Sequence, residues 1–498
     1  MKSIERLLKI DKGLPVSVYL QLTNAIITHI RQGTIKPGAA LPPSRVLAKA
    51  LNIHRKTVVA AYDELYAQSW VDVYPRKGIF VAHDLPEVSP RSIASRVPRH
   101  GVAKETFYQF PDKIMTAHVF VRGAPGNLIF NEGFPDTRIA PVELLVREFR
   151  RFGSYHFTQK YLMYGPEQGS ENLRAELARF LSETRGVQAG PQDILVTKGV
   201  QMAIYLVAQV LLAKGDAVIA ADPGYPGANE VFEQAGAQLA LVPVDEYGID
   251  LNAVEAVCKK KKVKLLYVIP HHHRPTTVTL ASERRMQLLE LAMKYKFAII
   301  EDDYDYDFHY SSSPILPLAS VDYYGSVIYV GSFCKTIAPG IRIGFAVAPH
   351  NLIIQLARLR RTIDRQGEQL LEEAMANLLK NGDIGRHLKK ANKIYHERRD
   401  VLCQLLTSRL GERVSFKIPD GGFAIWTKYM HGINAAEVAR KAAEMKLTVS
   451  DGSDYFYNSD NQSFLRLGFA SLNTTELEQS VDILKKAVDK VLKSSSQL

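Results

Sequence analysis

The run Ser332–Phe345, SFCKTIAPGIRIGF, combines a lysine with two side chains that suit a phosphate group. Lys335 stands among small, turn-forming residues, with Ser332 three positions before it and Arg342 seven positions after it. A lysine amine that has lost its proton can condense with an aldehyde, and nearby hydroxyl and guanidinium groups bind a phosphate dianion. The run therefore predicts a site for an aldehyde that carries a phosphate, such as pyridoxal phosphate. The alternative is a loop lysine beside a strand.

An acidic stretch upstream could serve the ring of that compound. The ring of pyridoxal phosphate acts as an electron sink while its nitrogen stays protonated, and this requires an acid. The stretch FAIIEDDYDYDF places Asp302 and Asp303 at the end of an apolar run, followed by Tyr304, which could hydrogen-bond the ring hydroxyl. Asp302 precedes Lys335 by 33 residues, which leaves room for a helix or loop and one more strand. A solvated acidic loop is the alternative.

Three further segments could complete such a site. Backbone N–H groups at a helix N-terminus bind phosphate, and Gly199, Val200 and Gln201 form a turn that opens a long apolar helix. Tyr225, on the proline–glycine turn of DPGYPG, could cover the ring. Arg466 in SFLRLGFA offers a fork-shaped cation for a substrate carboxylate, from an apolar strand where an unpaired charge is costly. An ordinary strand–helix turn and a buried structural ion pair are the alternatives.

From about residue 126 onward, helical stretches alternate with short apolar runs. The predicted strands are DILVTKG, DAVIAADPG, VKLLYVIP, FAIIEDDY and SVIYVGSF. Strands that alternate with helices predict a doubly wound α/β sheet, and ligands of such sheets bind at the carboxyl ends of the strands. The candidate residues fall at those ends, so the predicted fold would bring them together.

Seven motifs follow one another in the region 126–498: YGPEQGSENLR, TKGVQ, DPGYPG, PHHHRPT, EDDYD, SFCKTIAPGIRIG and FLRLGF. On these motifs the region resembles the fold-type I aminotransferases of class I and II. The resemblance implies a doubly wound sheet with a smaller α+β subdomain, and pyridoxal phosphate as cofactor. It implies that Lys335 forms the Schiff base, that Asp302 contacts the ring nitrogen and that Tyr304 contacts the ring hydroxyl. It also implies that Ser332 and Arg342 contact the phosphate. Tyr225 would stack on the ring, and Arg466 would bind the substrate carboxylate. Tyr164 resembles the tyrosine that reaches the phosphate of a neighbouring subunit, which implies a homodimer.

One segment departs from the pattern of that class. Where the class usually has Asn-Pro-Thr-Gly, this chain has Arg274-Pro275-Thr276-Thr277. Arg274 replaces the asparagine that contacts the ring hydroxyl, and it could perturb the lysine–cofactor aldimine or bind an acidic group of an effector. The histidines His271–His273 predict no metal site, because adjacent residues of an extended chain point to alternate sides and rarely converge on one ion. The departure puts efficient transamination in doubt, but not cofactor binding.

The formal charge of +11 is unevenly distributed along the 498 residues. Residues 1–110 hold 16 Lys and Arg against 8 Asp and Glu, whereas the remainder is nearly neutral. A basic end on a nearly neutral body predicts a partner with a phosphate backbone. A solvated basic surface is the alternative.

The basic region is predicted to contain a helix at 17–33, two short helices joined by a turn, and a hairpin. Ser44 is expected to cap the first short helix, with Val46, Leu47, Ala50 and Leu51 facing the core. In a helix-turn-helix the second helix enters the major groove with its N-terminal residues leading. Those residues are His54, Arg55, Lys56 and Thr57, all able to donate hydrogen bonds to phosphates or base edges. VDVYPRKGIFVA predicts a wing with Arg76 and Lys77 at its tip.

A set of residues between positions 14 and 82 carries a second resemblance: Leu41-Pro42, Ser44-Arg45, Leu47-Ala48, Arg55, Thr57-Val58, Ala61-Tyr62, Leu65, Gly78 and Phe80-Val81. On these residues the segment is similar to the GntR class of winged helix-turn-helix regulators. The similarity implies binding to double-stranded DNA. The implied contacts are Ser44, Arg45, Arg55, Thr57, Arg76 and Lys77. A winged helix used only for protein contacts is the alternative.

Residues 83–125 lose helical periodicity and gather prolines, serines and arginines. This composition predicts a flexible cationic linker between a DNA-binding domain at 1–82 and an effector domain at 126–498. The three cysteines, Cys258, Cys334 and Cys403, follow no metal-ligand or disulfide spacing, which fits a reducing cytosol. No apolar run has the length that a bilayer span requires. We therefore expect a cytoplasmic protein.

A GntR-type winged helix, a linker and an aminotransferase-like domain, in that order, form the arrangement of the MocR/GabR regulators. The resemblance implies a homodimeric transcription regulator that holds pyridoxal phosphate on Lys335 as an internal aldimine. An amino acid or amine effector would exchange onto the cofactor, with Arg466 and Arg274 holding its acidic groups. One alternative is an active aminotransferase that carries a DNA-binding domain. Another is a degenerate domain that binds no cofactor.

Overall fold

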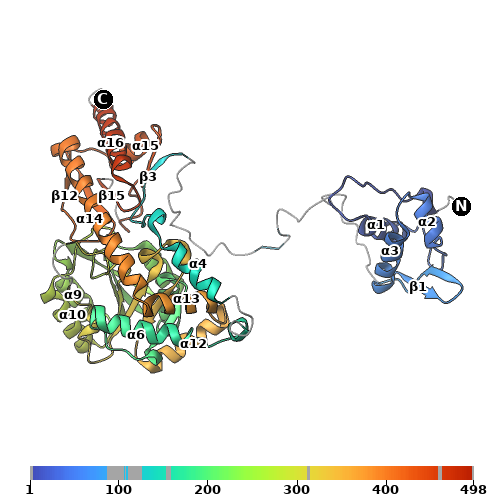
Figure 1. Cartoon of the computed structure of the whole chain (residues 1–498), viewed down its shortest axis with the longest axis horizontal. Helices are drawn as coiled ribbons and strands as arrows, with labels where there is room; N and C mark the ends of the chain where they lie inside the picture. Colours follow the sequence, from blue (N-terminus) through green and yellow to red (C-terminus); the bar gives the residue numbers. More distant parts are fainter. Residues whose placement is uncertain are drawn as a thin grey trace. The chain divides into compact units, whose positions relative to one another are not determined.

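The computed structural model describes residues 4–86, 106, 108–109, 126–152, 159–310, 315–457 and 463–495. The chain divides into two compact units, Met1–Phe110 and Pro111–Leu498 (Figure 1). The division falls within the predicted linker, 83–125, most of which lies outside the described residues. Among the helices that the structure describes, none has the length and apolar character needed to cross a membrane.

The first unit is built on three helices that share one core. They are α1 (Val18–Arg31), α2 (Ser44–Ala50) and α3 (Arg55–Ala67), after a short 3-10 helix at Ile4–Arg6. Leu22 and Ile26 of α1 pack with Val58 and Leu65 of α3 in this core. The apolar spacing thus predicted α1 and the buried face of α3 correctly.

Two expectations about α2 are wrong. The helix begins at Ser44, so Pro43 occupies the N-cap position and no side chain caps the helix. Val46 is 51% exposed and Ala50 is exposed as well, because this seven-residue helix turns Leu47 and Ala48 toward the core instead. The Ser44 hydroxyl accepts a hydrogen bond from Nε of Arg55 at 3.4 Å, so Ser44 lies beside the start of α3.

The predicted wing is present as an antiparallel hairpin. Strands β1 (Val71–Tyr74) and β2 (Gly78–Val81) pair with Tyr74 opposite Gly78. The N–H of Lys77 donates to the carbonyl oxygen of Tyr74 at 3.1 Å, and Arg76 has a φ of 65°. The tight turn therefore projects two cationic residues from one end of the hairpin.

The second unit contains a sheet of eight strands in the order β4-β11-β10-β9-β8-β5-β6-β7. The strands are β4 (Ile194–Thr197), β5 (Ala217–Asp222), β6 (Gln238–Asp245), β7 (Gly248–Ile249), β8 (Val263–Val268), β9 (Ala298–Asp302), β10 (Val327–Ser332) and β11 (Gly344–Val347). β10, β9, β8, β5 and β6 form parallel pairs in that succession. All five predicted strands are present, and the predicted doubly wound sheet is confirmed.

Three strands of this sheet, β6, β7 and β11, have no counterpart in the prediction. Of these, β11 is antiparallel to both of its neighbours. Only the short helix α11 (Phe333–Thr336) and a 3-10 turn at Pro339–Ile341 lie between β10 and β11. A parallel crossover needs about a dozen residues or more, usually with a full helix, so the chain returns beside β10 instead. This tight return carries Lys335 at the end of the sheet.

Helices cover both faces of the sheet. One face packs against α7 (Val200–Leu211), α8 (Pro226–Gln234) and α12 (His350–Ile363), and the other against α9 (Leu251–Lys260) and α10 (Ser282–Tyr295). Alternate strand residues serve the two layers: Val218 and Ile300 lie in the first cluster, and Ile219 and Ile299 in the second. This alternation leaves the carboxyl ends of the strands to present polar residues.

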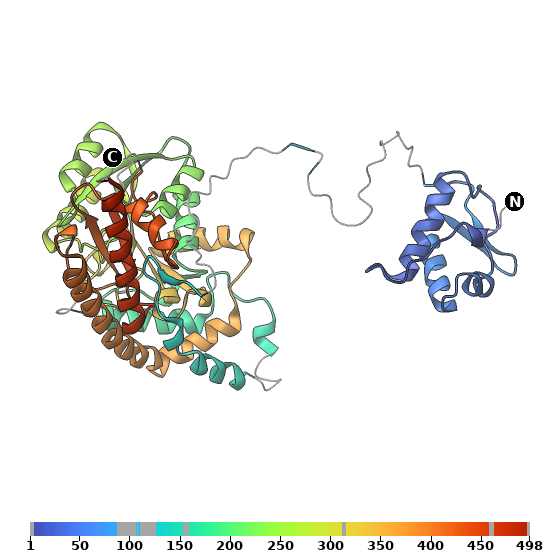
Figure 2. The same cartoon turned by 90° about the horizontal axis from the view of Figure 1, so that it is seen from above.

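A smaller α+β subdomain completes the second unit. Its three-stranded sheet is β12 (Val414–Phe416), β13 (Ala424–Tyr429) and β15 (Phe464–Gly468), and its parallel pair is β3 (Leu128–Phe130) with β14 (Leu447–Val449). Its helices are α14 (Asp383–Leu410), α15 (Ala435–Ala443) and α16 (Thr474–Ser495), and the two long ones, α14 and α16, pack side by side (Figure 2). Within the described residues of this unit, the remaining α-helices are α4 (Val142–Arg151), α6 (Glu171–Arg185) and α13 (Gln369–Lys380).

Candidate functional site

Lys335 lies on α11, half-buried after the end of β10. Its Nζ donates a hydrogen bond to the carbonyl oxygen of Gly133 at 2.6 Å and lies 4.0 Å from the ring centre of Phe134. Burial lowers the pKa of the Lys335 amine to about 7, with further lowering by the charges of Arg274 and Arg466. A large fraction of this lysine is therefore neutral near pH 7, the state in which an amine attacks an aldehyde.

This lowered pKa predicts how the reaction of Lys335 with pyridoxal phosphate depends on pH. Protonation blocks the amine below pH 7, so the rate at which cofactor-free protein develops its visible absorption band should rise through about pH 7. The rate should level off above about pH 8, whereas an unperturbed lysine has a pKa of about 10.4. Stopped-flow absorbance at a series of pH values measures this profile. A rate that still climbs steeply between pH 9 and 10 would contradict the prediction.

Asp302 ends β9 with one carboxylate oxygen unsatisfied. Its Oδ2 accepts a hydrogen bond from the hydroxyl of Tyr267 at 2.6 Å, while the buried Oδ1 has no hydrogen-bond partner among the described residues. Burial raises the pKa of Asp302 to about 7, against the opposing effect of the Tyr267 hydrogen bond. A buried acceptor without a partner is costly, and a protonated ring nitrogen would satisfy it. Asp303 is different, because it bonds His271 and Tyr329.

The N-terminus of α7 and the return after Lys335 form a cradle for a small anion. α7 begins at Val200 after Gly199, and no side chain caps it. A Cβ added to Gly199 would lie 3.0 Å from Nη1 of Arg342, so the glycine allows the guanidinium to lie against this turn. Arg342 also donates to the carbonyl oxygen of Lys198 at 2.5 Å. Backbone N–H groups at an open helix N-terminus beside an arginine suit a phosphate.

Two predicted phosphate-site residues already have partners. The Ser332 hydroxyl donates to the carbonyl oxygen of Ile343 at 3.1 Å and accepts from the N–H of Cys334 at 3.0 Å. Gln201 accepts from the hydroxyl of Tyr225 at 3.0 Å and donates to Gly227. Gln201 therefore holds the tyrosine that is predicted to cover the ring. Ser332 shapes the turn that precedes Lys335.

Arg274 pairs with a carboxylate of its own chain. Its guanidinium forms an ion pair with Glu132 and lies 5.3 Å from the ring centre of Tyr225. The other oxygen of Glu132 accepts from the hydroxyl of Tyr455 at 3.1 Å. We expected Arg274 to bind an acidic group of an effector. In this structure Glu132 provides that acidic group instead.

Arg466 lies fully buried on β15 near Lys335 and Tyr304. It donates to the carbonyl oxygens of Glu132 at 3.1 Å and Pro275 at 2.6 Å, and its third contact is the Tyr304 hydroxyl at 3.5 Å. In the described part of the chain, the ion pairs do not include Arg466. The alternative of a structural ion pair therefore has no support among those residues. Main-chain carbonyls orient the guanidinium but leave its charge unmatched.

Tyr304 and Tyr164 differ in their surroundings. The hydroxyl of Tyr304 donates to the carbonyl oxygen of His272 at 3.2 Å, and its ring centre lies 5.9 Å from Nζ of Lys335. Tyr164 is 73% exposed, with the guanidinium of Arg365 over its ring at 4.2 Å. The structure thus brings Tyr304 to Lys335, whereas the role predicted for Tyr164 involves a second subunit.

The three histidines have separate partners. His271 bonds Asp303 at 2.9 Å, His272 bonds Asp305 at 3.0 Å, and His273 bonds Thr276 at 2.9 Å. Among the residues that the structure describes, no group of three or more His, Cys, Asp or Glu could hold a metal ion. The histidines thus connect the segment 271–277 to the strand ends around it.

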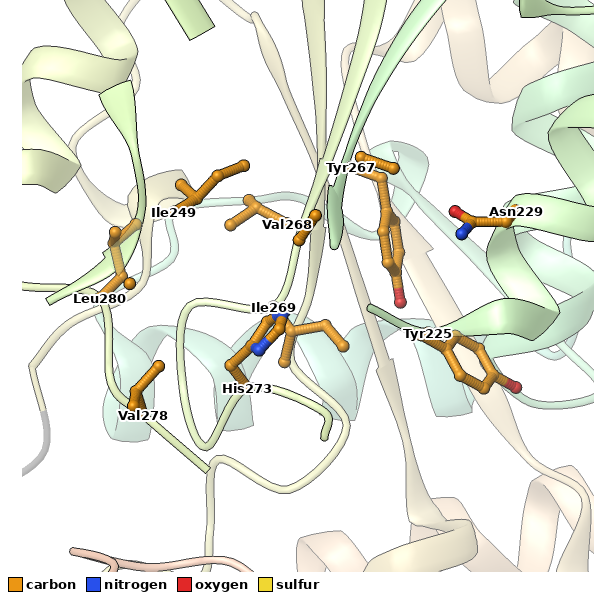
Figure 3. A pocket seen from close by; sticks show the side chains of 12 residues that line it. Tyr225, Asn229, Ile249, Tyr267, Val268, Ile269, His273, Val278 and Leu280 are labelled. Carbon is orange, nitrogen blue, oxygen red and sulfur yellow. The ribbon is translucent and has the colours of Figure 1, made fainter. Parts of the chain in front are cut away.

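Sequence reasoning missed Tyr267, Glu132 and Gly133. Tyr267 carries the hydroxyl that bonds Asp302, and the only signal was a single polar group in the apolar run VKLLYVIP. Glu132 and Gly133 follow β3 and reach Arg274 and Lys335 from more than a hundred residues away in sequence. Figure 3 shows Tyr267, Tyr225 and Asn229 together. Asn229 was also missed.

In the first unit, the start of α3 presents the predicted DNA contacts. His54 is the N-cap, and its Nδ1 accepts from the N–H of Lys56 at 3.2 Å. Arg55 and Lys56 are exposed, and Arg55 reaches Ser44. Arg45 on α2 and the wing residues Arg76 and Lys77 are also exposed. A cationic helix N-terminus and a cationic hairpin tip in one unit suit a phosphate backbone.

Two family models match this chain. Residues 128–484 match the model described as "Aminotransferase class I and II", and residues 18–81 match the one described as "Bacterial regulatory proteins, gntR family". The first match contains Lys335, Asp302 and Arg466, and the second contains α1, α2, α3 and the wing.

Similar proteins of two kinds align with the chain. The probable rhizopine catabolism regulatory protein MocR of Rhizobium meliloti is 27% identical over 482 residues, which cover 97% of this chain and 96% of that protein. The 2-aminoadipate transaminase of Thermus thermophilus is 30% identical over 375 residues, which cover 74% of this chain and 91% of that protein. The crystal structure of LysN, an α-aminoadipate aminotransferase of Thermus thermophilus complexed with N-(5'-phosphopyridoxyl)-L-leucine, matches with a TM-score of 0.69 and 28% identity, covering 74% of this chain and 94% of that one.

Proposed function

Because the chain belongs to the aminotransferase class I and II family and carries a gntR-family domain before the matched region, we propose that it is a pyridoxal phosphate-dependent transcription regulator. MocR-type regulators have the same combination of domains. The regulator would sense an amino acid or an amine. The observation that carries this proposal is the half-buried, largely neutral Lys335 in a chain that also presents an intact winged helix. The first unit would bind operator DNA, and the second would bind the effector.

Pyridoxal phosphate is the cofactor of the second unit. When bound, it supplies an aldehyde that amines capture and a ring that withdraws electrons. Asp302 offers the unsatisfied oxygen for the ring nitrogen, and the N-terminus of α7 with Arg342 offers the phosphate site. Tyr225, held by Gln201, would cover the ring. Lys335 supplies the amine, and the carbonyl oxygen of Gly133 orients it.

An amino acid effector has two groups that this site can recognise. Its amine would take the place of the Lys335 amine, and its carboxylate would bind the guanidinium of Arg466, which main-chain carbonyls already orient. The free amine of Lys335 donates to the carbonyl oxygen of Gly133, which belongs to the segment that follows β3 of the smaller subdomain, so this bond would be lost when the cofactor occupies the amine and could form again when the effector releases it. The exchange therefore alters a contact between the sheet and the smaller subdomain.

Regulation requires that the effector favour one arrangement of the protein on DNA. A ligand shifts such an equilibrium only by its differential affinity for the two states. A homodimer would place two winged helices on two half-sites, and the exposed Tyr164 would reach the partner's phosphate site. Such a regulator acts in the compartment that holds the DNA, the cytoplasm.

The proposal predicts that one amino acid changes both the visible band and operator affinity. In Arg466→Gln, the concentration of this amino acid for half-maximal change should rise about 10- to 100-fold, because hydrogen bonds to charged groups contribute about 1.5–3 kcal/mol. An amine without a carboxylate should titrate equally in both proteins. The measurements are a spectral titration and binding to a duplex selected from a random pool by the wild-type protein.

Two results would count against the regulator. Steady formation of product with a keto-acid acceptor, while operator affinity stays constant, would support an active aminotransferase instead. Equal titration of wild type and Arg466→Gln by the amino acid would leave Arg466 with a structural role only.

A further inference from the structure

A cavity of about 600 Å³ opens beside Tyr225, between α8 and the segment 453–457. The residues that line it are Asp222, Gly224, Pro226, Asn229, Glu230, Glu233, Gln234, Ser453, Asp454, Tyr455, Phe456 and Tyr457. Its size lies within the range of small-molecule sites, about 300–1,000 Å³. The cavity is thus large enough for the side chain of an amino acid or a longer amine.

The charge of this cavity is of one sign. Asp222, Glu230, Glu233 and Asp454 line it, and the described lining residues include no lysine or arginine. The hydroxyl of Tyr457 donates to Glu233, and its N–H donates to Asp222 at 3.1 Å, so the two carboxylates are fixed by one residue. Three aromatic side chains in a row complete the wall, and aromatic faces attract cations.

Asn229 lines the same cavity and has an unused amide. It is only 6% exposed, yet its side-chain amide makes no hydrogen bond to any described residue. Figure 3 shows this amide close to Tyr225 and Tyr267, on α8. The polar atoms of this amide are not among the buried atoms that lack a partner, so a ligand that enters the cavity can hydrogen-bond them in place of water. This observation is independent of the carboxylates.

The cavity adjoins the Lys335 site. Pro226 of its wall directly follows Tyr225, and the carbonyl oxygen of Tyr455 accepts from the N–H of Gly224 at 3.3 Å. The Tyr455 hydroxyl bonds Glu132, whose carbonyl oxygen orients Arg466. Tyr455 thus joins the wall of the cavity to the residues that orient Arg466.

We propose that the effector carries a second cationic group, as a basic amino acid or a diamine does, and that this acidic cavity binds that group. The inference rests on the proposed sensing function and specifies its ligand class. A ligand with a distal carboxylate would meet four carboxylates here, while Arg274 is already paired with Glu132. The cavity thus favours a ligand whose distal group is positive, whereas the distal group of 2-aminoadipate is a negative carboxylate.

Amino acids of similar length but different distal charge test this inference on the full-length protein with bound cofactor. The visible band is titrated with lysine, norleucine, 2-aminoadipate and 1,5-diaminopentane. We expect lysine to reach the half-maximal change of the band at a concentration about tenfold or more below that of norleucine, because unlike charges a few ångströms apart attract. We expect 2-aminoadipate to require the highest concentration of the three amino acids, because like charges at that distance repel. The diamine arm shows whether the ligand class needs a carboxylate.

Variants connect the preference to the cavity. In the double variant Glu230→Gln, Glu233→Gln, the ratio between norleucine and lysine concentrations should fall to near one. Glu246→Gln, an exposed glutamate on the β6–β7 turn, removes the same charge elsewhere and should keep the wild-type ratio. Norleucine equal to or better than lysine in the wild-type protein would overturn the inference while the sensing function stands. If no amine shifts the band, the sensing function fails, and the inference fails with it.

Discussion

Replacing Lys335 with alanine should abolish the visible band that pyridoxal phosphate gives with the wild-type protein. It should also abolish the effect of amino acids on operator binding. The amine of Lys335 is the nucleophile that the site prepares, because burial lowers its pKa to about 7 and Gly133 orients it. Lys335 follows the end of β10, and β10 pairs with β9, which ends at Asp302. The measurement is absorbance spectroscopy of both proteins after addition of the cofactor.

A matched variant separates this effect from a general loss of lysine. Lys264 is exposed on β8, so Lys264→Ala should keep both the band and the effector response. A band that survives in Lys335→Ala would show that another amine captures the cofactor. A wild-type protein without any such band would instead support a degenerate domain that binds no cofactor.

Most of the fold follows from short-range patterns. The alternation of apolar runs with helical stretches predicts β4, β5, β8, β9 and β10 because each strand is buried by helices on both faces. The antiparallel β11 does not follow from such a pattern. Its direction depends on the length of the return after Lys335, and the sequence there resembles any other strand. The prediction of which α2 residues are buried was wrong for a related reason, because seven residues define the buried face of a helix poorly.

The site divides in a similar way between local and distant contacts. Lys335, Asp302 and the α7 N-terminus lie at strand ends, where the chain order itself places them. The pairing of Arg274 with Glu132 joins residues 142 positions apart, and no periodic pattern indicates such a contact. The acidic cavity is likewise formed by α8 and the segment 453–457, which only the folded chain brings together. The sequence prediction of an acidic effector group used Arg274 alone, whereas the cationic group proposed above requires residues from both of these segments.

Replacing Arg55 with alanine should weaken operator binding by about 10- to 100-fold, since a good side-chain contact to a base is worth about 1–3 kcal/mol. Arg55 is the first residue of α3, the predicted recognition helix, and its Nε contacts Ser44 in a geometry that projects the guanidinium from the helix start. Binding should weaken more for the selected duplex than for a scrambled one if Arg55 contacts bases. The measurement is fluorescence anisotropy with both duplexes at one fixed salt concentration.

Lys77→Ala distinguishes a phosphate contact from a base contact in the same assay. Lys77 lies at the tip of the wing, where a tight turn projects its ammonium group. Loss of one phosphate contact reduces the slope of log K against log salt by about 0.9 and weakens both duplexes alike. Lys264→Ala removes the same charge from the second unit and should leave slope and affinity unchanged, because Lys264 belongs to the sheet of the effector domain. If Arg55→Ala and Lys77→Ala both bind like wild type, the winged helix serves protein contacts, and the effector signal must reach DNA by another surface.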